Sequence, residues 1–355
     1  MMLLIQQPVV PHYRVPFFRL LLTEVGPFVL AAGSINGDKT ISTSEEILAD
    51  VTLLRNRYIL KGNFLWQSGL IRLALKADVV VLNFDIRHLS SWLVLLLRSA
   101  KRKRTILWGH AEGSRSYLHM LRFMMVRGSS KFIAYTETEA NHVRKLYGVD
   151  RVTYLGNSCV YEAECQFKCN LVEDRNVVLY VGRLTKAKKP DLLLRAFIAA
   201  KDSGQLSSDC RLLLVGSGPL WEALKAEAKA SNWYGSIEIP GEITEAKQLE
   251  KLYATAFCAV SPGYAGLSVI QALAFGVSFV LPRGEKHSPE VEACEEGFNS
   301  YYFQLENVES LASTLGVAYG ERINRHKIGS AIALRIKERY TYEGMYRRFA
   351  EAIKS

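Results

Sequence analysis

Residues 176–202 read NVVLYVGRLTKAKKPDLLLRAFIAAKD, and this stretch decides the fold. Its apolar run at 177–181 has the length of a buried strand, and a glycine ends the run. A basic loop follows, and from Pro190 onward apolar residues recur at helical spacing. A strand followed directly by a helix is the repeating unit of a parallel sheet with covered faces. The stretch therefore predicts an α/β protein with a doubly wound sheet.

The same alternation extends in both directions along the chain. In the first half we expect strands at residues 2–6, 27–33, 77–84, 104–110, 131–136 and 151–156, and helices at 15–25, 64–76, 90–102 and 138–148. In the second half we expect further strands at 211–218, 236–241, 257–263 and 277–282, and helices at 220–230, 249–256 and 268–276. Two such runs predict two Rossmann-like doubly wound domains that face a cleft. We place them at 1–165 and 166–335, and we expect a helix at 336–355 to cross back to the first domain.

Length and composition agree with two domains. The chain has 355 residues, of which 49% are apolar and 23% charged, as in a globular enzyme. Its net charge is +10, and residues 1–170 hold 22 Lys or Arg against 13 Asp or Glu, whereas 171–355 hold 23 against 22. This asymmetry indicates an anionic partner for the first half, either nucleic acid or an anionic membrane. No helix-turn-helix, RNA-recognition or zinc-finger pattern is present, so we expect no nucleic acid.

The sequence favours a cytoplasmic protein without a cofactor. The N-terminus lacks a basic region and a small-residue cleavage site, and the apolar run near 92–97 is far shorter than the ~20 residues that span a bilayer. The cysteines form no CxxC pair and no metal spacing with histidine, so reduced thiols are expected at 159, 165, 169, 210, 258 and 294. No Asp-x-Asp pair, phosphate-loop motif or GxGxxG after the first strand is present, so no metal or cofactor is implied.

Four loops after predicted strands of the second half have the residues of an anion and sugar site. The first holds Arg183, a bidentate phosphate ligand, and Lys188, a point charge. The second, 215–219, is VGSGP, and the third, 261–268, is SPGYAGLS at the start of a helix, where backbone N–H groups bind anions. The fourth, 282–292, mixes donors and carboxylates. Each loop read alone also fits a solvated loop or a tight strand–helix turn.

Taken together, these loops resemble the retaining glycosyltransferases of family 4, which have the GT-B fold. The resemblance covers about residues 177–303, in the order VGRLTKAKKPDLLLRAF, LLLVGSGP, IEIPGEI and SPGYAGLSVIQALAFGVSFVLP…HSPEVEACEEGFN. It implies that Arg183 and Lys188 hold the diphosphate of a nucleotide-sugar donor. It further implies donor-binding roles for the backbone of the glycine-rich loops, for a residue beside the base and for residues that bind sugar hydroxyls: Gly182, Gly216, Glu242, Gly266, Leu267, Gln271 and Glu290.

The sequence departs from the family at two positions. The family carries two glutamates eight positions apart around the third loop, and here these positions are Gly263 and Gln271. A glutamine still bonds ribose hydroxyls, although it carries no charge, and its alternative interpretation is a buried polar residue satisfied by the backbone. A subgroup of the family has a PGxxGL pattern at this point, so the loss is compatible with activity.

The first half resembles the family more loosely. PHYRVPFFRLL, residues 11–21, is similar to the family's opening strand, loop and helix, which implies that Arg14 lies near the acceptor or a phosphate. RTILWGHAEG, residues 104–113, is similar to a tryptophan-glycine-histidine segment, which implies a catalytic role for His110. A lone histidine is also compatible with a structural role. The carboxylates at 137–139 are expected to cap a helix, and Tyr135 and Thr136 to line the cleft.

The resemblance implies a metal-independent enzyme that moves a sugar from a nucleotide sugar to a glycan or lipid-linked acceptor with retention. No carboxylate is placed as a nucleophile, so a same-face route is expected, in which the leaving phosphate takes the acceptor proton. The alternative is a catalytically silent GT-B-like binding protein, and a GT-B epimerase or phosphorylase is a minor one. The basic segment Arg98–Arg104 after an apolar helix favours peripheral binding to an anionic membrane or, equally, a solvated helix end.

Overall fold

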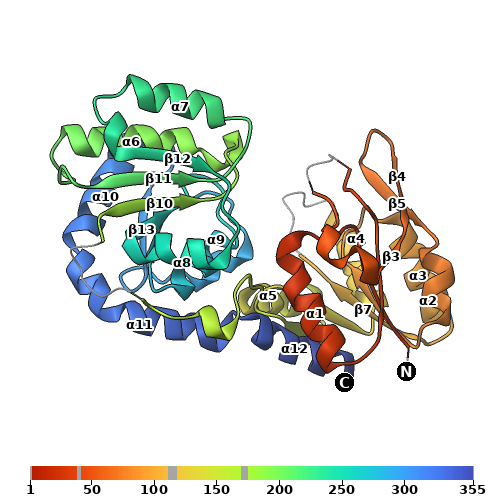
Figure 1. Ribbon diagram of the computed structural model, residues 1–355. Helices are drawn as coiled ribbons and strands as arrows, with labels where there is room; N and C mark the ends of the chain where they lie inside the picture. The colour runs from red at the N-terminus through yellow and green to blue at the C-terminus, as the bar shows by residue number, and fades with distance from the viewer. Residues whose placement is uncertain (1, 38–40, 111–117, 169–174, 355) are drawn as a thin grey trace. The chain divides into compact units, whose positions relative to one another are not determined.

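The computed structural model describes residues 2–37, 41–110, 118–168 and 175–354 (Figure 1). The chain forms two compact units: unit 1 consists of Met1–Cys159 and Tyr342–Ser355, and unit 2 of Val160–Thr341. These limits differ by a few residues from the expected division after 165 and after 335. The second difference has a clear cause, because helix α11, Arg322–Arg339, continues through residue 335 without a break. Cys169 lies outside the described residues.

Unit 1 is built on one parallel sheet with the strand order β3-β2-β1-β6-β7-β8-β9. The strands are β1 (Leu3–Gln7), β2 (Val29–Ala32), β3 (Val51–Leu53), β6 (Val79–Asn83), β7 (Arg104–Trp108), β8 (Lys131–Ala134) and β9 (Val152–Tyr154). Every strand expected in the first half is present. The strands after β1 are added toward one edge of the sheet, and from β6 onward toward the other edge. The switch point of this sheet therefore lies at the carboxyl ends of β1 and β6.

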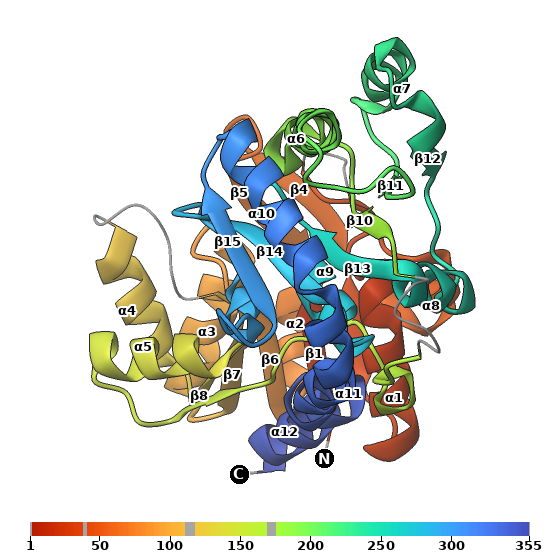
Figure 2. The ribbon, with the colours of Figure 1, turned by 90° about the vertical axis from the view of Figure 1, so that its left-hand side faces the viewer.

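Helices cover both faces of this sheet, because successive strand residues point to opposite sides. One face packs against α1 (Val15–Glu24) and α12 (Tyr342–Lys354), which contact each other. The other packs against α2 (Leu70–Lys76), α3 (Leu89–Ala100), α4 (His119–Gly128) and α5 (Glu137–Tyr147). Figure 2 shows α12 beside the sheet of unit 1, far along the sequence from its neighbours. Phe349 of α12 packs edge-on against Phe17 and Trp108.

The expectation of one helix at 64–76 is wrong in its first part. Phe64–Ser68 is a strand, β5, which pairs antiparallel with β4, Arg55–Ile59, in a separate two-stranded sheet. Gly69 has φ 95°, a left-handed conformation that separates the strand from α2. The side chains of β5 alternate between half-buried and buried, which is strand rather than helical periodicity.

Unit 2 is a second parallel sheet, with the order β12-β11-β10-β13-β14-β15. Its strands are β10 (Val177–Val181), β11 (Arg211–Val215), β12 (Ile237–Gly241), β13 (Ala256–Val260), β14 (Ser278–Arg283) and β15 (Ser300–Gln304). One face is covered by α6 (Pro190–Asp202), α7 (Trp221–Ala230) and α10 (Val308–Gly320), and the other by α8 (Ala246–Thr255), α9 (Ser268–Ala274) and α11. The order reverses between β10 and β13, which places the switch point at the ends of these two strands.

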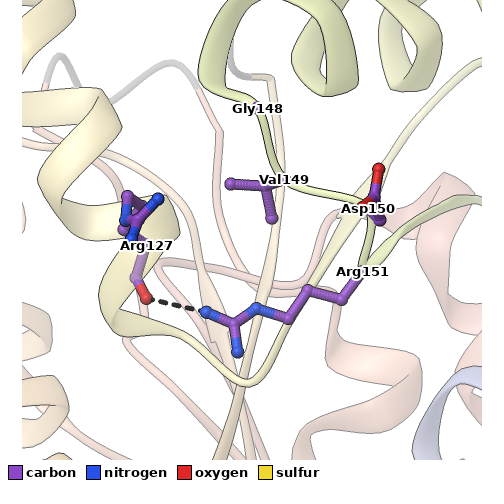
Figure 3. A pocket seen from close by; sticks show the side chains of 5 residues that line it. All are labelled: Arg127, Gly148, Val149, Asp150 and Arg151. Carbon is purple, nitrogen blue, oxygen red and sulfur yellow. Dashed lines mark hydrogen bonds between the residues drawn. The ribbon is translucent and has the colours of Figure 1, made fainter.

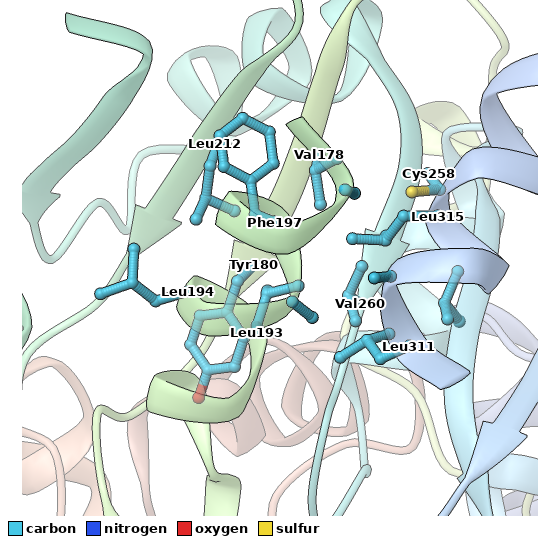
Figure 4. Packing of buried hydrophobic residues seen from close by; sticks show 14 of the residues in the cluster. Val178, Tyr180, Leu193, Leu194, Phe197, Leu212, Cys258, Val260, Leu311 and Leu315 are labelled. Carbon is cyan, nitrogen blue, oxygen red and sulfur yellow. The ribbon is translucent and has the colours of Figure 1, made fainter. Parts of the chain in front are cut away.

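The core of unit 2 lies between the sheet and the α6–α10 pair, as Figure 4 shows. Phe197 of α6 and Leu315 of α10 are fully buried against Val178 of β10. Tyr180 is almost fully buried too, but its hydroxyl group donates a hydrogen bond of 2.8 Å to the carbonyl oxygen of Arg183. The core side of the sheet therefore fixes the backbone of the first basic loop.

The basic segment Arg98–Arg104 is mostly part of the fold rather than a free surface. Arg98 has an exposed fraction of 0%, and its guanidinium donates to the carbonyl oxygens of Ala74, Ala77, Asp78 and Arg104 and to the hydroxyl group of Thr105. Arg104 donates to the carbonyl oxygens of Ala352 and Ile353 in α12. Lys103 donates to Leu75 O at 2.8 Å. Among the cations of the segment, only Lys101 and Arg102 are exposed.

Replacing Arg98 with leucine should therefore destabilise unit 1 strongly. The substitution leaves several buried carbonyl oxygens without donors, and each costs about 1–3 kcal/mol. We expect a loss of at least ~3 kcal/mol in the free energy of unfolding, measured by urea titration with circular dichroism. The exposed neighbour provides the control, since Lys101→Ala should change stability by less than about 0.5 kcal/mol. A small effect of Arg98→Leu would show that the buried guanidinium is not a structural centre.

Candidate functional site

The loops that follow β10, β11 and β13 contact one another at the carboxyl edge of the unit 2 sheet. An added Cβ atom at Gly216 would lie 1.8 Å from the carbonyl oxygen of Gly182, and one at Gly218 would lie 2.5 Å from that of Leu184. The backbones are thus too close for any side chain. Leu184 N–H also donates to Ser217 O at 2.8 Å. The first two sequence motifs therefore form one surface.

Gly263 shows the same constraint at the switch point. Its Cβ position lies 2.4 Å from the carbonyl oxygen of Ala187 and 3.0 Å from the carbonyl carbon of Lys188. Tyr264 N–H donates to the same Ala187 oxygen at 3.1 Å. No glutamate fits at 263 with this backbone, so the departure from the family pattern has a steric cause here.

The third and fourth loops are also joined. Ala265 N–H donates to His287 Nδ1 at 3.1 Å, and Ser288 N–H donates to Ala265 O at 2.9 Å. His287 Nε2 lies 3.1 Å from the carbonyl oxygen of Pro282, so the proton is on Nε2. Burial lowers the pKa of His287, which agrees with this neutral form. The neutral ring holds the glycine-rich loop against the end of β14.

Arg183 and Lys188 lie in this surface in different environments. Arg183 is exposed, whereas Lys188 is half-buried and its ammonium group donates to Tyr264 O at 2.6 Å. The same ammonium group lies 4.7 Å from the centre of the Tyr264 ring. Burial lowers the pKa of Lys188 to about 8, and the nearby positive charge of Arg183 adds to this effect while Glu290 opposes it. The negative charge of Glu290 therefore does not offset the effect of burial on the pKa of Lys188.

The other donor-side candidates lie around the same edge. Glu242 is exposed after β12 and accepts a hydrogen bond of 3.1 Å from the Ser217 hydroxyl group. Glu290 is 2% exposed in a 3₁₀ turn, Pro289–Ala293, and accepts from the hydroxyl group of Ser288. Gln271 Oε1 accepts from the Tyr253 hydroxyl group at 3.1 Å, which ties the side chain to α8. Gly266 and Leu267 directly precede α9.

In unit 1, the two candidates from the first half lie in one aromatic cluster. Arg14 is 8% exposed, and its guanidinium carbon lies 5.3 Å from the ring centre of Trp108 and 5.2 Å from that of Tyr135. His110 follows β7 and packs against Tyr135, with ring centres 4.2 Å apart and the ring planes tilted by 44°. Its Nδ1 lies 3.3 Å from Oε1 of Glu139, so Nδ1–H donates to the carboxylate and Nε2 is the acceptor face.

Sequence reasoning missed Glu139 as a partner of the histidine. Thr136, not Glu139, caps α5 by accepting from Glu139 N–H. The Glu139 carboxylate is 3% exposed and also accepts from Tyr135 N–H at 3.0 Å. Glu137 and Glu139 do lie in the first turn of α5, as expected, but the side-chain cap is Thr136, and the contact of Glu139 with His110 is an additional role that the sequence did not indicate. Ser217, Tyr264 and His287 were likewise quoted within motifs but not singled out.

Other features carry no comparable chemistry. Within the described residues, no group of three or more His, Cys, Asp or Glu side chains could hold a metal ion. In the same part of the chain, no helix is long and apolar enough to span a bilayer. An open pocket lined by Arg127, Gly148, Val149, Asp150 and Arg151 lies at the amino ends of β8 and β9, where Arg151 donates to Arg127 O (Figure 3). This is the edge opposite to the one that carries His110, since parallel strands share their directions.

Known proteins resemble this chain in part of its sequence and in its whole fold. Residues 162–334 match the family model described as Glycosyl transferases group 1. A sequence search of curated proteins gives no match. The solved structure of Anabaena HepE in complex with UDP has a TM-score of 0.75 at 14% identity, with 99% of each chain covered. A glycosyltransferase from Rickettsia africae has a TM-score of 0.73 at 13% identity, with 99% of this chain and 97% of the other covered.

A third structure, the lipopolysaccharide outer core galactosyltransferase WaaB in its apo form, has a TM-score of 0.67 at 13% identity and covers 99% of each chain. At such identities the likeness establishes the fold alone, and it confirms the predicted GT-B class. The family match spans all four donor-side loops, from Gly182 to Glu290.

The steric account of Gly263 predicts a large effect of the smallest substitution. Gly263→Ala places a Cβ atom against Ala187 O, so the two loops must separate, at a cost of about 1–3 kcal/mol. We expect a lower melting temperature by differential scanning calorimetry, and Gly263→Glu should be no better tolerated. Gly235→Ala is the matched control, because nothing lies within 4 Å of its Cβ position. Equal melting temperatures for Gly263→Ala and the control would contradict the close approach.

Proposed function

Because residues 162–334 match the group 1 glycosyl transferases, we propose that the protein is a glycosyltransferase that moves a sugar from a nucleoside-diphosphate donor to an acceptor hydroxyl group. The observation that carries the proposal is the joined loop surface of unit 2, on which Arg183 and Lys188 meet the glycine-rich loop at the switch point. Ligands of open α/β sheets bind at this place. Both cations suit a diphosphate that gains negative charge as the sugar leaves.

We propose donor-side roles for residues of unit 2. Arg183, exposed on a backbone held by Tyr180, is the bidentate phosphate ligand, and Lys188 is the buried point charge. The backbone of Gly266 and Leu267 offers N–H groups to the same phosphates. Glu242 is the proposed neighbour of the base, while Gln271 and Glu290 are proposed to contact ribose and sugar hydroxyl groups. Gly182 and Gly216 keep the two loops close enough to share the ligand.

The acceptor side is proposed to lie in unit 1. Glu139 orients His110 so that Nε2 is free of the carboxylate and available to a sugar or acceptor hydroxyl group. Arg14 is too enclosed by rings to serve as an open phosphate ligand, and we propose that its charge acts through the cluster that holds His110. The proposed reaction is retaining and needs no metal ion: the leaving phosphate takes the acceptor proton on the same face, as the family 4 resemblance implies.

The solved relatives support the choice of substrates. Anabaena HepE was solved with UDP and with UDP-glucose, and WaaB is a galactosyltransferase of the lipopolysaccharide outer core. We accordingly propose a nucleotide-sugar donor and a nascent surface glycan or lipid-linked acceptor. A cytoplasmic enzyme that is peripheral on the inner membrane face fits such an acceptor. The second candidate is a catalytically silent sugar-nucleotide-binding protein, which the glycine at 263 favours.

Replacing Arg183 with alanine should lower kcat/KM about 100-fold or more, because an electrostatic contact to the leaving diphosphate is lost. The assay measures nucleoside diphosphate released from a panel of nucleotide sugars, with product analysis. Arg195→Ala is the matched control, an exposed arginine of α6 paired with Asp191. Near-normal turnover of the Arg183 variant would overturn the donor assignment. Nucleotide binding by the wild type without any transfer or hydrolysis would favour the silent binding protein.

The lowered pKa of Lys188 predicts a proton uptake on binding. At about pH 8 half of these side chains are neutral, and a bound diphosphate raises their pKa, so binding draws in about half a proton. Affinity for the nucleoside diphosphate should fall as pH rises through 8, since the neutral amine attracts no phosphate. Calorimetry at pH 8 in two buffers of different ionisation enthalpy measures this uptake. Lys188→Arg should abolish it, whereas equal uptake in the variant would assign the proton to another group.

A further inference from the structure

The β4–β5 hairpin stands apart from the main sheet of unit 1 but is tied to it at its base. It pairs with no strand of the parallel sheet. The Asn56 amide donates to the carbonyl oxygens of Pro8 and Ile35, and Gln67 donates to Gln7 O at 3.1 Å. Gly37 leaves room for the Tyr58 ring, since an added Cβ atom would lie 2.9 Å from it. One face of the hairpin is thus packed on the rest of unit 1.

The other face points away from the unit. In the antiparallel register Ile59 pairs with Phe64, and Arg57 pairs with Trp66, so these four side chains share one face with Arg55. Arg55, Arg57 and Ile59 are exposed, and Phe64 and Trp66 are half-buried. We call these five residues, with Leu60 and Lys61 of the turn, the hairpin face. It combines aromatic, aliphatic and cationic side chains and holds no carboxylate, and beside it lie the Ser68 hydroxyl group and the exposed Asn63 amide of the turn.

The turn presents its apolar side chain at a conformational cost. Leu60 is 68% exposed and Ile59 44% exposed. Leu60 has φ 51° and Lys61 φ 57°, a left-handed backbone that favours glycine or asparagine over leucine. A leucine that is exposed and conformationally unfavourable contributes little to the fold. Its place at the tip therefore indicates contact with an apolar phase.

The charge around the hairpin selects the partner. Between Asp50 and Asp78 the chain holds five cations and no carboxylate. In a two-fold interface the same patch is used on both copies, so two such hairpin faces would place cations of both copies in one interface without a carboxylate of either face to balance them. A site for hydroxyl-rich glycans combines carboxylates with amides, whereas the hairpin face holds no carboxylate and the turn offers only the Asn63 amide. An anionic lipid surface matches it, because aliphatic and aromatic side chains enter the headgroup boundary while Arg and Lys meet lipid phosphates.

We propose that the hairpin face is the surface by which the protein docks on an anionic lipid bilayer, with Ile59 and Leu60 entering the membrane boundary and Arg55, Arg57 and Lys61 among the headgroups. The inference rests on the membrane part of the proposed function and replaces the segment Arg98–Arg104, most of which is used inside the fold. It gives the N-terminal unit a defined orientation toward a lipid-linked acceptor.

The test is sedimentation of the full chain with phosphatidylcholine vesicles, with and without phosphatidylglycerol. The wild type should bind the anionic vesicles and not the neutral ones. Leu60→Asn should weaken binding severalfold, and adding Ile59→Ser should weaken it about tenfold or more. Arg55→Glu with Arg57→Glu should also cost about tenfold. Asparagine suits the left-handed backbone at 60, so the melting temperature of Leu60→Asn should be unchanged or higher, which separates lost docking from unfolding.

Matched controls test whether the site or only the composition matters. Ile323→Ser with Leu334→Ser removes two exposed aliphatic side chains of unit 2, and Lys229→Glu with Lys337→Glu reverses two exposed charges there. Neither pair should change binding.

Three outcomes would overturn the inference. They are no vesicle binding by the wild type, unchanged vesicle binding by the hairpin variants, or binding of a soluble anionic polysaccharide, and not of vesicles, that the hairpin variants lose. Nucleoside diphosphate release with a soluble acceptor is measured in parallel without lipid, and the hairpin variants should keep it. Vesicle binding without turnover would reject the transferase proposal and leave the docking surface supported.

Discussion

The candidate site depends on how closely the backbones approach one another at the carboxyl edge of unit 2. Three glycines, Gly216, Gly218 and Gly263, face carbonyl oxygens at distances that no Cβ atom tolerates. Because these contacts join the loops after β10, β11 and β13, the position of each loop is set by its neighbours rather than by its own conformation. The backbone positions of Arg183 and Lys188 are therefore fixed by the neighbouring loops. The site needs it, since electrostatic stabilisation of a leaving group requires charges that do not reorganise during the reaction.

The same contacts explain why the family's charged pattern is altered. A glutamate at 263 would need the basic loop to move away, and the loop is held from below by Tyr180 and from above by Tyr264. Lys188 consequently gains a carbonyl oxygen and an aromatic ring as neighbours in place of a carboxylate. An ammonium group that is partly buried without a full counter-charge has a lowered pKa. A phosphate placed beside it would supply that counter-charge. In the proposed reaction, the diphosphate of the donor supplies this counter-charge.

Sequence alone predicted most of the parallel strands, because short apolar runs report burial directly. It missed the edge strands β3 and β15 and the helices α4, α10 and α11. It failed at Phe64–Ser68, where FLWQS also fits the apolar spacing of a helix, and only pairing with β4 decides between the two. The motif residues of unit 2 were identified through their place after strands. Glu139 was correctly placed in the first turn of a helix, but its contact with His110 was missed. That contact depends on β7 and β8 lying side by side, which no local sequence pattern reports.

Net charge marks which half of the chain meets an anion, but not which residues do so. Arg98 and Arg104 donate hydrogen bonds to carbonyl oxygens, and these bonds hold α3 and α12 to the sheet. A cation used in this way contributes to the +10 and yet presents nothing to a partner. The hairpin cations differ because Arg55 and Arg57 are exposed, and the sequence holds no carboxylate between Asp50 and Asp78. Burial, rather than charge density along the sequence, therefore separates structural arginines from those available for binding.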